Sequence, residues 1–421
     1  MQIYKFGGAS IATPDRMKAL MPILQSASKP LIMVVSALGK TTNALEKVVE
    51  GANIQDFENT EKQIKDLEIQ HFEYSKSLGL SDEDYKPLHD KLKSVFDEMR
   101  LIVQKDNLMQ FDYLYDQIVC QGELLSTLIL DAYLKSEGLK SQWLDARQLI
   151  CTNAIYRDAQ VEEQASEKAV QAAVLPLLDH KEVIVTQGFI GKTKEGNSTT
   201  LGREGSDYTA ALLGGFLNAN GVSIWKDVEG LLNADPRLFP DAVRISEISF
   251  NEVIEMAYYG AQVIHPKTIK PLHNKNIPLY VKCFLDKDLP GTIIKNKVKA
   301  IYPPIIVLKP NQALIQVISK DYSFVTEDVL SDIYEIFAKH HVKINIMQNA
   351  AISMVAAVDN RKDKIFPLIE DLSKNYEVRR NEGATLLTIR HYDENTIEKL
   401  TKDKKVLLTQ KTRRTIQLIV K

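Results

Sequence analysis

The first segment of the chain has residue types that suit the capture of a phosphate group. Lys5-Phe6-Gly7-Gly8-Ala9-Ser10 places a lysine at the end of a short apolar strand, followed by two glycines and the start of a helix. Glycines let backbone N–H groups approach a phosphate closely, and the helix N-terminus adds a favourable dipole. The Lys5 ammonium would neutralise charge on a transferring phosphoryl group. An ordinary tight turn explains the glycine pair equally well, so this segment alone leaves both interpretations open.

A second segment offers groups that could hold a carboxylate and orient that lysine. Leu201-Gly202-Arg203-Glu204-Gly205-Ser206-Asp207 follows a loop rich in Gly, Ser and Thr and precedes a helix expected from Tyr208. Arg203 can bind a carboxylate through two parallel hydrogen bonds, and Ser206 with the helix N-terminus adds donors. Asp207 can orient a lysine ammonium. It also suits the N-cap of the expected helix, and both roles can hold together.

Two further segments resemble the end of a phosphate-binding P-loop but lack its first glycine. Gly39-Lys40-Thr41 and Gly191-Lys192-Thr193 each need a glycine five positions earlier. The chain has Val34 and Thr186 there, and no G-x-G-x-x-G loop follows the first strand. A nucleotide would therefore be held by another design, of which the Lys5 segment is the candidate.

Apolar strands alternate with helices over the first half of the chain. The runs Leu31–Val35, Val183–Thr186 and Val222–Trp225 are apolar almost throughout, as are strands buried on both faces of a parallel sheet. Pro14–Gln25 has the apolar spacing of a helix, and residues 51–117 have the spacing of a helical insertion over one end of the sheet. The pattern predicts an α/β three-layer sandwich with a mainly parallel sheet.

The sequence changes character at Tyr302-Pro303-Pro304, which we interpret as a linker between domains. The order strand, helix, strand, strand, helix, strand follows, which is the ferredoxin-like order. A shorter copy comes after it and is either truncated or borrows a strand from just before Ala313. We expect a first domain at 1–300, a second at 301–380, and a short or incomplete third at 381–421.

Composition bounds the class of protein but not its chemistry. The 421 residues include 53 Lys and Arg against 55 Asp and Glu, a net charge of −2 that argues against a general nucleic-acid binder. The cysteines at 120, 151 and 283 lie far apart, which favours a reducing compartment over a disulfide framework or a zinc motif. No signal-peptide pattern and no apolar run of about 20 residues is present. We expect a cytoplasmic protein without nucleic-acid or membrane partners.

Seven segments in a fixed order resemble those of a known family. Besides the two described above, they are Ser36-Ala37-Leu38-Gly39-Lys40-Thr41-Thr42-Asn43, Gly122-Glu123-Leu124-Leu125-Ser126-Thr127, Trp225-Lys226-Asp227-Val228-Glu229-Gly230, Asp235-Pro236-Arg237 and Tyr259-Gly260-Ala261-Gln262-Val263-Ile264-His265-Pro266. Together they resemble aspartate kinase in its monofunctional form, and the tail resembles the ACT regulatory domains of that family. The resemblance implies an amino-acid-kinase fold and ATP-dependent phosphorylation of the β-carboxylate of L-aspartate. That reaction is the first step toward lysine, threonine and methionine.

The resemblance also implies a role for each matching residue. Lys5 and Asp207 would be catalytic, with Lys5 on the transferring phosphate and Asp207 holding it in register. Arg203 would bind the aspartate α-carboxylate and Glu123 its α-ammonium. The residues implied to complete the amino-acid pocket are Ser36, Thr42 and Ser206. Those implied to contact the nucleotide are Lys5, Phe6, Gly7, Gly8, Lys226, Asp227, Leu232, Arg237 and Gln262. An exposed helix position for Glu123 and a helix N-cap for Thr42 stay open as structural alternatives.

Some positions depart from the family pattern. Gln262 stands where many members have a lysine, Leu232 where a tyrosine is frequent, and Glu204 where many have glycine. We expect the Glu204 carboxylate to point outward, away from an anionic substrate. His265 is expected to be a turn residue rather than a base. Mg²⁺ is implied as an ion carried on the ATP phosphates, without a dedicated protein metal site.

The resemblance further implies a homodimer formed through the tail and an amino-acid effector, lysine or threonine. Which effector acts stays open, because the turn Gln348-Asn349-Ala350-Ala351-Ile352-Ser353 lacks an acidic residue often found in lysine-inhibited forms. Two other functions are alternatives: a kinase for glutamate, acetylglutamate or UMP, and a non-catalytic amino-acid sensor. The Glu123 and Arg203 pair disfavours UMP, which has no ammonium. Retention of Lys5, Glu123, Arg203 and Asp207 argues against the sensor.

Overall fold

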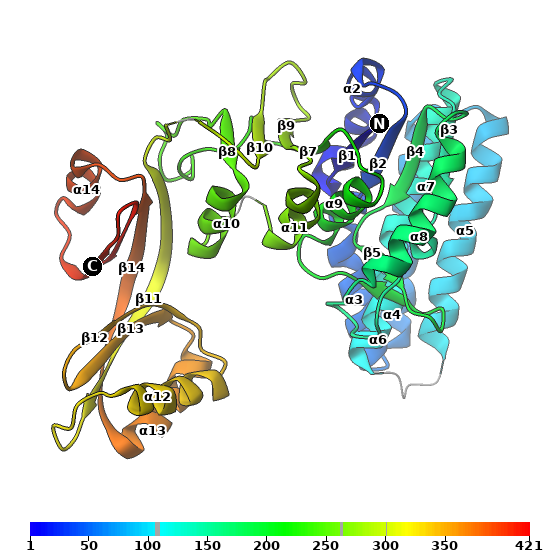
Figure 1. The fold of residues 1–421 in the computed structure, drawn as a ribbon. Helices are drawn as coiled ribbons and strands as arrows, with labels where there is room; N and C mark the ends of the chain where they lie inside the picture. Colours follow the sequence, from blue (N-terminus) through cyan, green and yellow to red (C-terminus); the bar gives the residue numbers. More distant parts are fainter. Residues whose placement is uncertain (106–109, 262–263, 300) are drawn as a thin grey trace. The chain divides into compact units, whose positions relative to one another are not determined.

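The computed structural model describes residues 1–105, 110–261, 264–299 and 301–421 of the chain. They separate into two units, each with its own sheet (Figure 1). The first unit consists of Met1–Leu231, Ser246–Ile254 and Ile264–Val298, and the second of Leu232–Ile245, Glu255–Val263 and Lys299–Lys421. Within the described residues, no helix combines the length and the apolar character that crossing a membrane requires.

An eight-stranded sheet with the order β3-β4-β2-β1-β7-β9-β10-β8 forms the centre of the first unit. Its strands are β1 (Gln2–Phe6), β2 (Leu31–Val35), β3 (Ser141–Leu144), β4 (Val183–Gln187), β7 (Val222–Lys226), β8 (Glu247–Ser249), β9 (Leu279–Cys283) and β10 (Thr292–Lys295). Neighbours are parallel from β3 through β9, β10 is antiparallel to β9, and β8 is parallel to β10. Strands β2 and β4 are buried at every residue, as expected of strands covered on both faces.

Two groups of helices lie around this sheet, and one helix of each group makes the main contacts with its strands (Figure 1). The first group is α3 (Thr41–Asn53), α4 (Phe57–Ser77), α5 (Asp82–Gln104), α6 (Phe111–Val119) and α7 (Gln121–Ser136). The second is α8 (Glu163–Val174), α9 (Gly205–Phe216) and α11 (Pro266–Lys275). Helix α7 packs on β2, β3 and β4, whereas α9 packs on β1, β2 and β7. The mainly parallel sheet with helices around it confirms the predicted fold class.

The carboxyl ends of four adjacent strands meet at one edge of this sheet. Phe6 of β1 is in register with Val35 of β2 and Trp225 of β7, and Val35 is in register with Gln187 of β4. The segments that leave β1, β2, β4 and β7 therefore begin side by side. In open parallel sheets this edge is where ligands bind.

A small antiparallel hairpin of β5 (Ile190–Lys192) and β6 (Ser198–Thr200) lies outside the main sheet. It occupies the connection from β4 to α9, and β6 runs directly into the Leu201–Asp207 segment. Helix α9 begins at Gly205 with Glu204 as its N-cap, in the left-handed conformation at φ 54°. Asp207 is therefore in the first turn of α9 and is not its N-cap, so that structural alternative was wrong.

One expected helix of the first unit is divided in two. Residues 14–25 form α1 (Pro14–Lys18) and α2 (Met21–Ser26) instead of one continuous helix. Proline lacks a backbone N–H and fits best in the first turn of a helix, where that N–H would have no partner within the helix. Pro22 accordingly lies in the first turn of a new helix, which ends the preceding one.

The second unit contains a six-stranded antiparallel sheet with the order β12-β13-β11-β14-β16-β15. Its strands are β11 (Ile305–Ser319), β12 (Ile344–Asn349), β13 (Ser353–Asp359), β14 (Tyr376–Arg390), β15 (Val406–Lys411) and β16 (Thr415–Val420). Its helices are α12 (Glu327–Lys339), α13 (Lys362–Asn375) and α14 (Glu394–Thr401), and α10 (Phe250–Tyr259) has residues in both units. The sequence β11-α12-β12-β13-α13-β14 is the predicted ferredoxin-like order.

Two long strands run through both halves of this sheet. The last part of β11 pairs with the first part of β14, for example Ser319 with Tyr376. The first part of β11 pairs with the last part of β14, as Ile305 does with Arg390. The shorter copy in the tail therefore uses a strand that precedes Ala313, which was the second of the two alternatives.

Candidate active site

A buried ion pair lies where β1 meets α9. Lys5 Nζ is 2.7 Å from Asp207 Oδ1, and the two side chains are only 12% and 3% exposed. Lys226, the last residue of β7, brings its Nζ to 3.9 Å from Asp207 Oδ2. Because β1 and β7 are parallel neighbours, both lysines reach the same edge of the sheet. One carboxylate thus aligns two cations, an arrangement that can neutralise and orient a phosphate.

Three glycines lie at this edge, and two of them let backbone segments approach one another closely. A Cβ on Gly8 would lie 2.6 Å from the carbonyl oxygen of Ala37, and a Cβ on Gly7 would lie 3.4 Å from Lys5 Nζ. Gly188, directly after β4, would place a Cβ 2.4 Å from the Cβ of Ser206. A side chain at Gly8 would push the β1 loop away from the β2 loop, and one at Gly188 would push the β4 loop away from the start of α9, whereas Gly7 has room for a contact of ordinary length.

Serine hydroxyls connect the segments that follow β2 and precede α9. Ser36 Oγ donates to Ser206 Oγ at 3.0 Å, which joins two residues 170 positions apart. Ser126 on α7 donates to the backbone oxygen of Ser36 at 2.9 Å and also contacts the Glu123 carbonyl at 3.0 Å. These bonds bring the Ser36 and Ser206 positions together and tie them to the first turns of α7.

Glu123 in the first turn of α7 is a buried carboxylate with an unsatisfied oxygen. The residue is 2% exposed, and its Oε2 has no hydrogen-bond partner among the described residues. Burial raises the pKa of Glu123 to about 8, against the opposing effect of backbone N–H groups of Glu123 and Ala37. Burial of a carboxylate is costly unless a cation or donors compensate it. Glu123 is therefore suited to bind a cation supplied by a ligand, and it is not an exposed helix residue.

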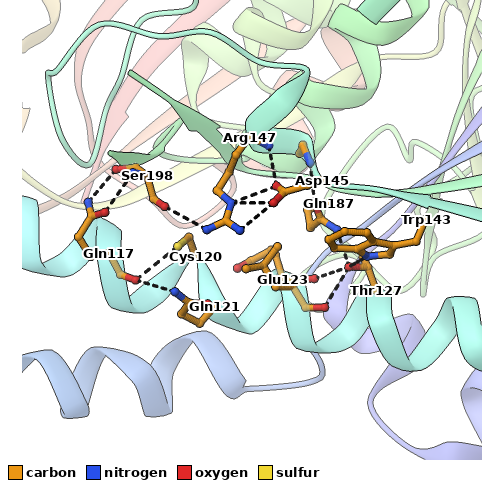
Figure 2. Close-up of polar contacts among 12 residues, drawn as sticks. Gln117, Cys120, Gln121, Glu123, Thr127, Trp143, Asp145, Arg147, Gln187 and Ser198 are labelled. Carbon is orange, nitrogen blue, oxygen red and sulfur yellow. Dashed lines mark hydrogen bonds and ion pairs between the residues drawn. The ribbon is translucent and has the colours of Figure 1, made fainter. Parts of the chain in front are cut away.

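A polar network fixes the helix turn that carries Glu123 (Figure 2). Thr127 Oγ1 donates to the Glu123 carbonyl at 2.8 Å and accepts from Trp143 Nε1 at 3.0 Å and Gln187 Nε2 at 2.6 Å. Gln187 Oε1 in turn accepts from the Ala146 backbone N–H at 2.7 Å. The network joins α7 to β3 and β4, so the direction of the Glu123 side chain is set by three elements.

The arginine in this close-up is already neutralised (Figure 2). Arg147 pairs with Asp145 through Nε at 3.0 Å and Nη2 at 2.7 Å, a two-bond arrangement that engages the carboxylate fully. Arg147 therefore has its own counterion, and Glu123 is left for a ligand.

Arg203 and Glu204, at the start of α9, differ in their contacts. Arg203 is exposed and makes no ion pair or hydrogen bond within the described part of the chain. The Glu204 carboxylate does not point freely outward as expected, because its Oε2 accepts a hydrogen bond from the His265 backbone N–H at 2.9 Å. His265 is the N-cap of α11, with Nδ1 accepting from the Lys267 N–H. Its expected role as a turn residue is confirmed.

The remaining predicted site residues lie in several places. Thr42 is the second residue of α3, whose N-cap is Lys40, so the N-cap alternative for Thr42 was wrong. Asp227 is exposed directly after β7. Leu232 and Arg237 belong to the second unit, where the exposed Arg237 donates to Asp235 at 2.7 Å. Gln262 lies outside the described residues.

Several residues that shape this site were not predicted. Gly188, Thr127 and Ser126 act through contact with predicted residues rather than through chemistry of their own. Gly188 carried a local signal, because a glycine directly after a buried strand indicates a close approach of backbone, and Ser126 and Thr127 lie in the Gly122–Thr127 segment of the family resemblance. The hydrogen bonds of Ser126 and Thr127 depend on tertiary neighbours, which sequence spacing does not reveal.

The described residues contain no group of three or more His, Cys, Asp or Glu side chains that could hold a metal ion. The carboxylate at the phosphate end, Asp207, is engaged by Lys5 and faces Lys226. The donor set therefore fits an ion that arrives with a ligand, and it does not fit a resident metal centre.

Known proteins share this sequence and fold. The model of the amino acid kinase family matches residues 1–283. Lysine-sensitive aspartokinase 3 of Escherichia coli is 31% identical over 399 residues, which covers 92% of this chain and 86% of that protein. The crystal structure of E. coli aspartokinase III with aspartate and ADP superposes with a TM-score of 0.81 at 28% identity, covering 100% of this chain and 96% of that one.

A second crystal structure of the E. coli enzyme, with lysine and aspartate in the T-state, has a TM-score of 0.82 at 27% identity. It covers 100% of this chain and 96% of that chain. The sequence match covers 92% of this chain and the fold match covers all of it. The chain therefore belongs to the amino acid kinase family and, within that family, to the aspartokinases.

Proposed function

We propose that this aspartokinase transfers the terminal phosphoryl group of ATP to the β-carboxylate of L-aspartate. The products are 4-phospho-L-aspartate and ADP, and the reaction is the first step toward lysine, threonine and methionine. The observation that carries the proposal is the buried Glu123 carboxylate, whose Oε2 has no partner among the described residues. A substrate ammonium would supply the missing cation, which ATP alone does not have. The related E. coli enzyme was crystallised with aspartate and ADP.

Aspartate would be held through its charged groups at both ends. Glu123 pairs with the α-ammonium and the exposed Arg203 binds the α-carboxylate with two hydrogen bonds. Ser36, Thr42 and Ser206 complete the pocket, supported by the 3.0 Å bond between the two serine hydroxyls. This recognition leaves the β-carboxylate free to react.

The phosphoryl transfer needs alignment and charge compensation rather than a covalent intermediate. A β-carboxylate oxygen, already ionised at neutral pH, attacks the terminal phosphorus, and the bond to the bridging oxygen of ADP breaks. Lys5 compensates charge on the transferring group, and Asp207 keeps that lysine in place. Backbone N–H groups at Gly7 and Gly8 contact the phosphates.

Further residues besides Lys5, Gly7 and Gly8 would contact the nucleotide. We assign this role to Phe6, Lys226, Asp227, Leu232, Arg237 and Gln262. Lys226 is supported by its 3.9 Å approach to Asp207, which places a second cation at the phosphate end. Mg²⁺ would be carried on the ATP phosphates and supply charge neutralisation there, since this ion usually keeps several waters and uses few protein ligands.

The domain organisation supports catalysis in one part and regulation in the other. We assign catalysis to residues 1–300, with a helical insertion at 51–117, and regulation to ACT-like units at 301–380 and 381–421. The unit in the tail would form a homodimer and bind lysine or threonine as effector in a cytoplasmic enzyme. Assays with millimolar lysine or threonine test this part. If neither amino acid lowers the activity, feedback control by them is ruled out.

Release of ADP from Mg-ATP tests the reaction itself. We expect release with L-aspartate and none above background with L-glutamate, acetylglutamate or UMP. Release with glutamate alone would show that the acceptor is glutamate and not aspartate, still within the amino acid kinase family. No release with any acceptor, from a chain that folds and binds aspartate, would favour the non-catalytic sensor.

A further inference from the structure

The strand that leads into the candidate substrate loop has little support from its own hairpin. β6 has three residues and, in the described part of the chain, forms a sheet with β5 alone. To this sheet the Ala159 N–H adds a 3.0 Å bond to the Thr200 carbonyl, and Thr152 adds a 2.7 Å hydroxyl bond to Thr199. Thr200 is its last residue, and the Leu201–Asp207 segment with Arg203 follows at once. An isolated two-stranded hairpin is marginally stable. The position of Arg203 therefore depends on what else holds β6.

A buried carboxylate on α6 holds one end of β6. Asp116 is 0% exposed, and its Oδ2 accepts from the Thr200 backbone N–H at 2.9 Å and the Arg157 backbone N–H at 3.0 Å. Its Oδ1 accepts from Thr200 Oγ1 at 2.7 Å. Hydrogen bonds to an ionised carboxylate are short and strong. Asp116 thus fixes Thr200 through both its backbone and its side chain.

The next residue of α6 holds the other end of β6 (Figure 2). Gln117 Oε1 accepts from the Ser198 N–H at 3.0 Å, and Gln117 Nε2 donates to the Ser198 carbonyl at 2.9 Å. The side-chain amide therefore pairs with Ser198 as a neighbouring strand would. Asp116 and Gln117 together, which we call the α6 clamp, grip β6 on either side of Thr199.

The α6 clamp is directly connected to the helix that carries Glu123. Helix α6 ends at Val119 and α7 begins at Gln121, whose Nε2 donates to the Gln117 carbonyl at 3.3 Å. Glu123 comes six positions after Gln117 along this pair of helices. The clamp therefore joins the segment holding Glu123 to the loop holding Arg203.

Burial of the Asp116 carboxylate is costly, and this burial acts on its protonation. It raises the pKa of Asp116 to about 6, whereas the bonds from Thr200 and the Arg157 N–H oppose that rise. The carboxyl is therefore mainly ionised at neutral pH, where both oxygens accept. An asparagine has one acceptor oxygen, which could keep the two N–H bonds, and its N–H would face Thr200 Oγ1, whose hydroxyl would then have to accept instead of donate. The exchange therefore replaces three bonds to a charged carboxylate by weaker neutral ones.

We propose that the α6 clamp is a positioning device for aspartate recognition, which sets the location of Arg203 relative to Glu123. The proposal rests on the proposed function, because it assigns those two residues to the two charges of the amino acid. Asp116 and Gln117 act through the loop and do not contact the substrate. A displacement of about 1 Å in a binding group can cost about 100-fold in rate.

Comparison of Asp116→Asn with Asp131→Asn tests the proposal. Asp131 is a matched control, because it is also buried and also joins a helix to a strand, accepting from Ser141 Oγ at 2.6 Å. It lies on α7 away from β6. We expect D116N to raise KM for aspartate by about 10-fold or more and to leave KM for ATP unchanged, and D131N to change neither. Equal KM values for aspartate in D116N, D131N and wild type would overturn the proposal.

Two further measurements cover misfolding of D116N and failure of the proposed function. Thr200→Val removes one of the three bonds, and we expect it to raise KM for aspartate about threefold. If D116N does not fold, an unchanged KM in T200V overturns the clamp. Hydrogen exchange at the Ser198 and Thr200 amides needs no substrate. Faster exchange there in D116N but not in D131N supports the clamp even if wild type proves inactive on aspartate, and unchanged exchange contradicts it.

Discussion

The two ends of the candidate site differ in where each buried charge finds its partner. At the phosphate end, Asp207 has Lys5 at 2.7 Å and Lys226 at 3.9 Å. At the amino-acid end, Glu123 is as deeply buried but has an oxygen without a partner among the described residues. The protein therefore neutralises the first carboxylate itself, and in the proposed function the second waits for the substrate ammonium. The phosphate end is organised in advance, whereas the amino-acid end gains its counterion only on binding.

Removal of the internal counterion should have the largest effect. Asp207→Ala frees Lys5 and Lys226 from their common partner, so both cations lose their alignment with the transferring group. We expect kcat to fall by about 1,000-fold, which is the loss seen when a well-placed electrostatic contact is removed. Steady-state ADP formation measures the change, and circular dichroism checks that the fold is retained. Activity near that of wild type would refute the role of Asp207.

Removal of the uncompensated charge should act on substrate binding. Glu123→Gln keeps the shape of the side chain but cannot form an ion pair with the α-ammonium. We expect kcat/KM for aspartate to fall by about 100-fold at pH 8, with KM for ATP unchanged. A variant with equal losses for aspartate and ATP would show that Glu123 supports the site as a whole.

The same variant should be more stable than wild type when no substrate is present. Because burial raises the pKa of Glu123 in the folded state to about 8, the folded protein holds a proton that the unfolded chain releases. Stability from this carboxyl is therefore lost as pH rises from its unfolded pKa toward 8. Denaturant unfolding should show an E123Q advantage that is larger at pH 8 than at pH 5.

The pH dependence of activity provides a smaller effect with a defined direction. In the free enzyme the Glu123 carboxyl, with a pKa of about 8, is mostly neutral at pH 7 and ionises as the pH rises. Only the anion attracts the ammonium, so kcat/KM for aspartate should rise by about tenfold from about pH 7 to about pH 8.5. E123Q should lack this rise. A flat profile in wild type would contradict the comparison between the two ends.

The hydroxyl pair between the two ends should contribute least. Ser36→Ala removes the donor to Ser206 and leaves both charged groups in place. We expect kcat/KM for aspartate to fall by about threefold, the value of one neutral hydrogen bond. Ser77→Ala is a matched control, because its hydroxyl bonds a carbonyl of its own helix on the exposed surface. A loss with S36A as large as that with E123Q would mean that hydroxyl contacts rather than charge dominate the pocket.

Much of the fold could be predicted, because buried strands and helices have characteristic patterns of apolar residues in the sequence. The uninterrupted apolar run at Leu31–Val35 gave a strand with the same bounds, and the ferredoxin-like order of the tail was also predicted. The break between α1 and α2 was missed, because the apolar spacing continues through it. Only Pro22 marks the new helix.

The site was predictable where a residue type has distinctive chemistry. An aspartate at a helix start can orient a lysine ammonium, and the family resemblance implied that this lysine is Lys5, as the ion pair shows. The α6 clamp could not be predicted, because Asp116 and Gln117 are ordinary helix residues whose partners on β6 lie more than 80 positions away. The contact of the Glu204 carboxylate was missed for a similar reason, since its partner is the backbone N–H of His265.

The long strands β11 and β14 have a consequence for the independence of the two tail units. Each strand supplies backbone hydrogen bonds to both halves of the six-stranded sheet, from Ile305 with Arg390 to Ser319 with Tyr376. A chain shortened after position 380 would keep β11 intact but leave its first residues without their neighbours. We therefore expect the halves to unfold together in a single transition, because both depend on the backbone of the same two strands.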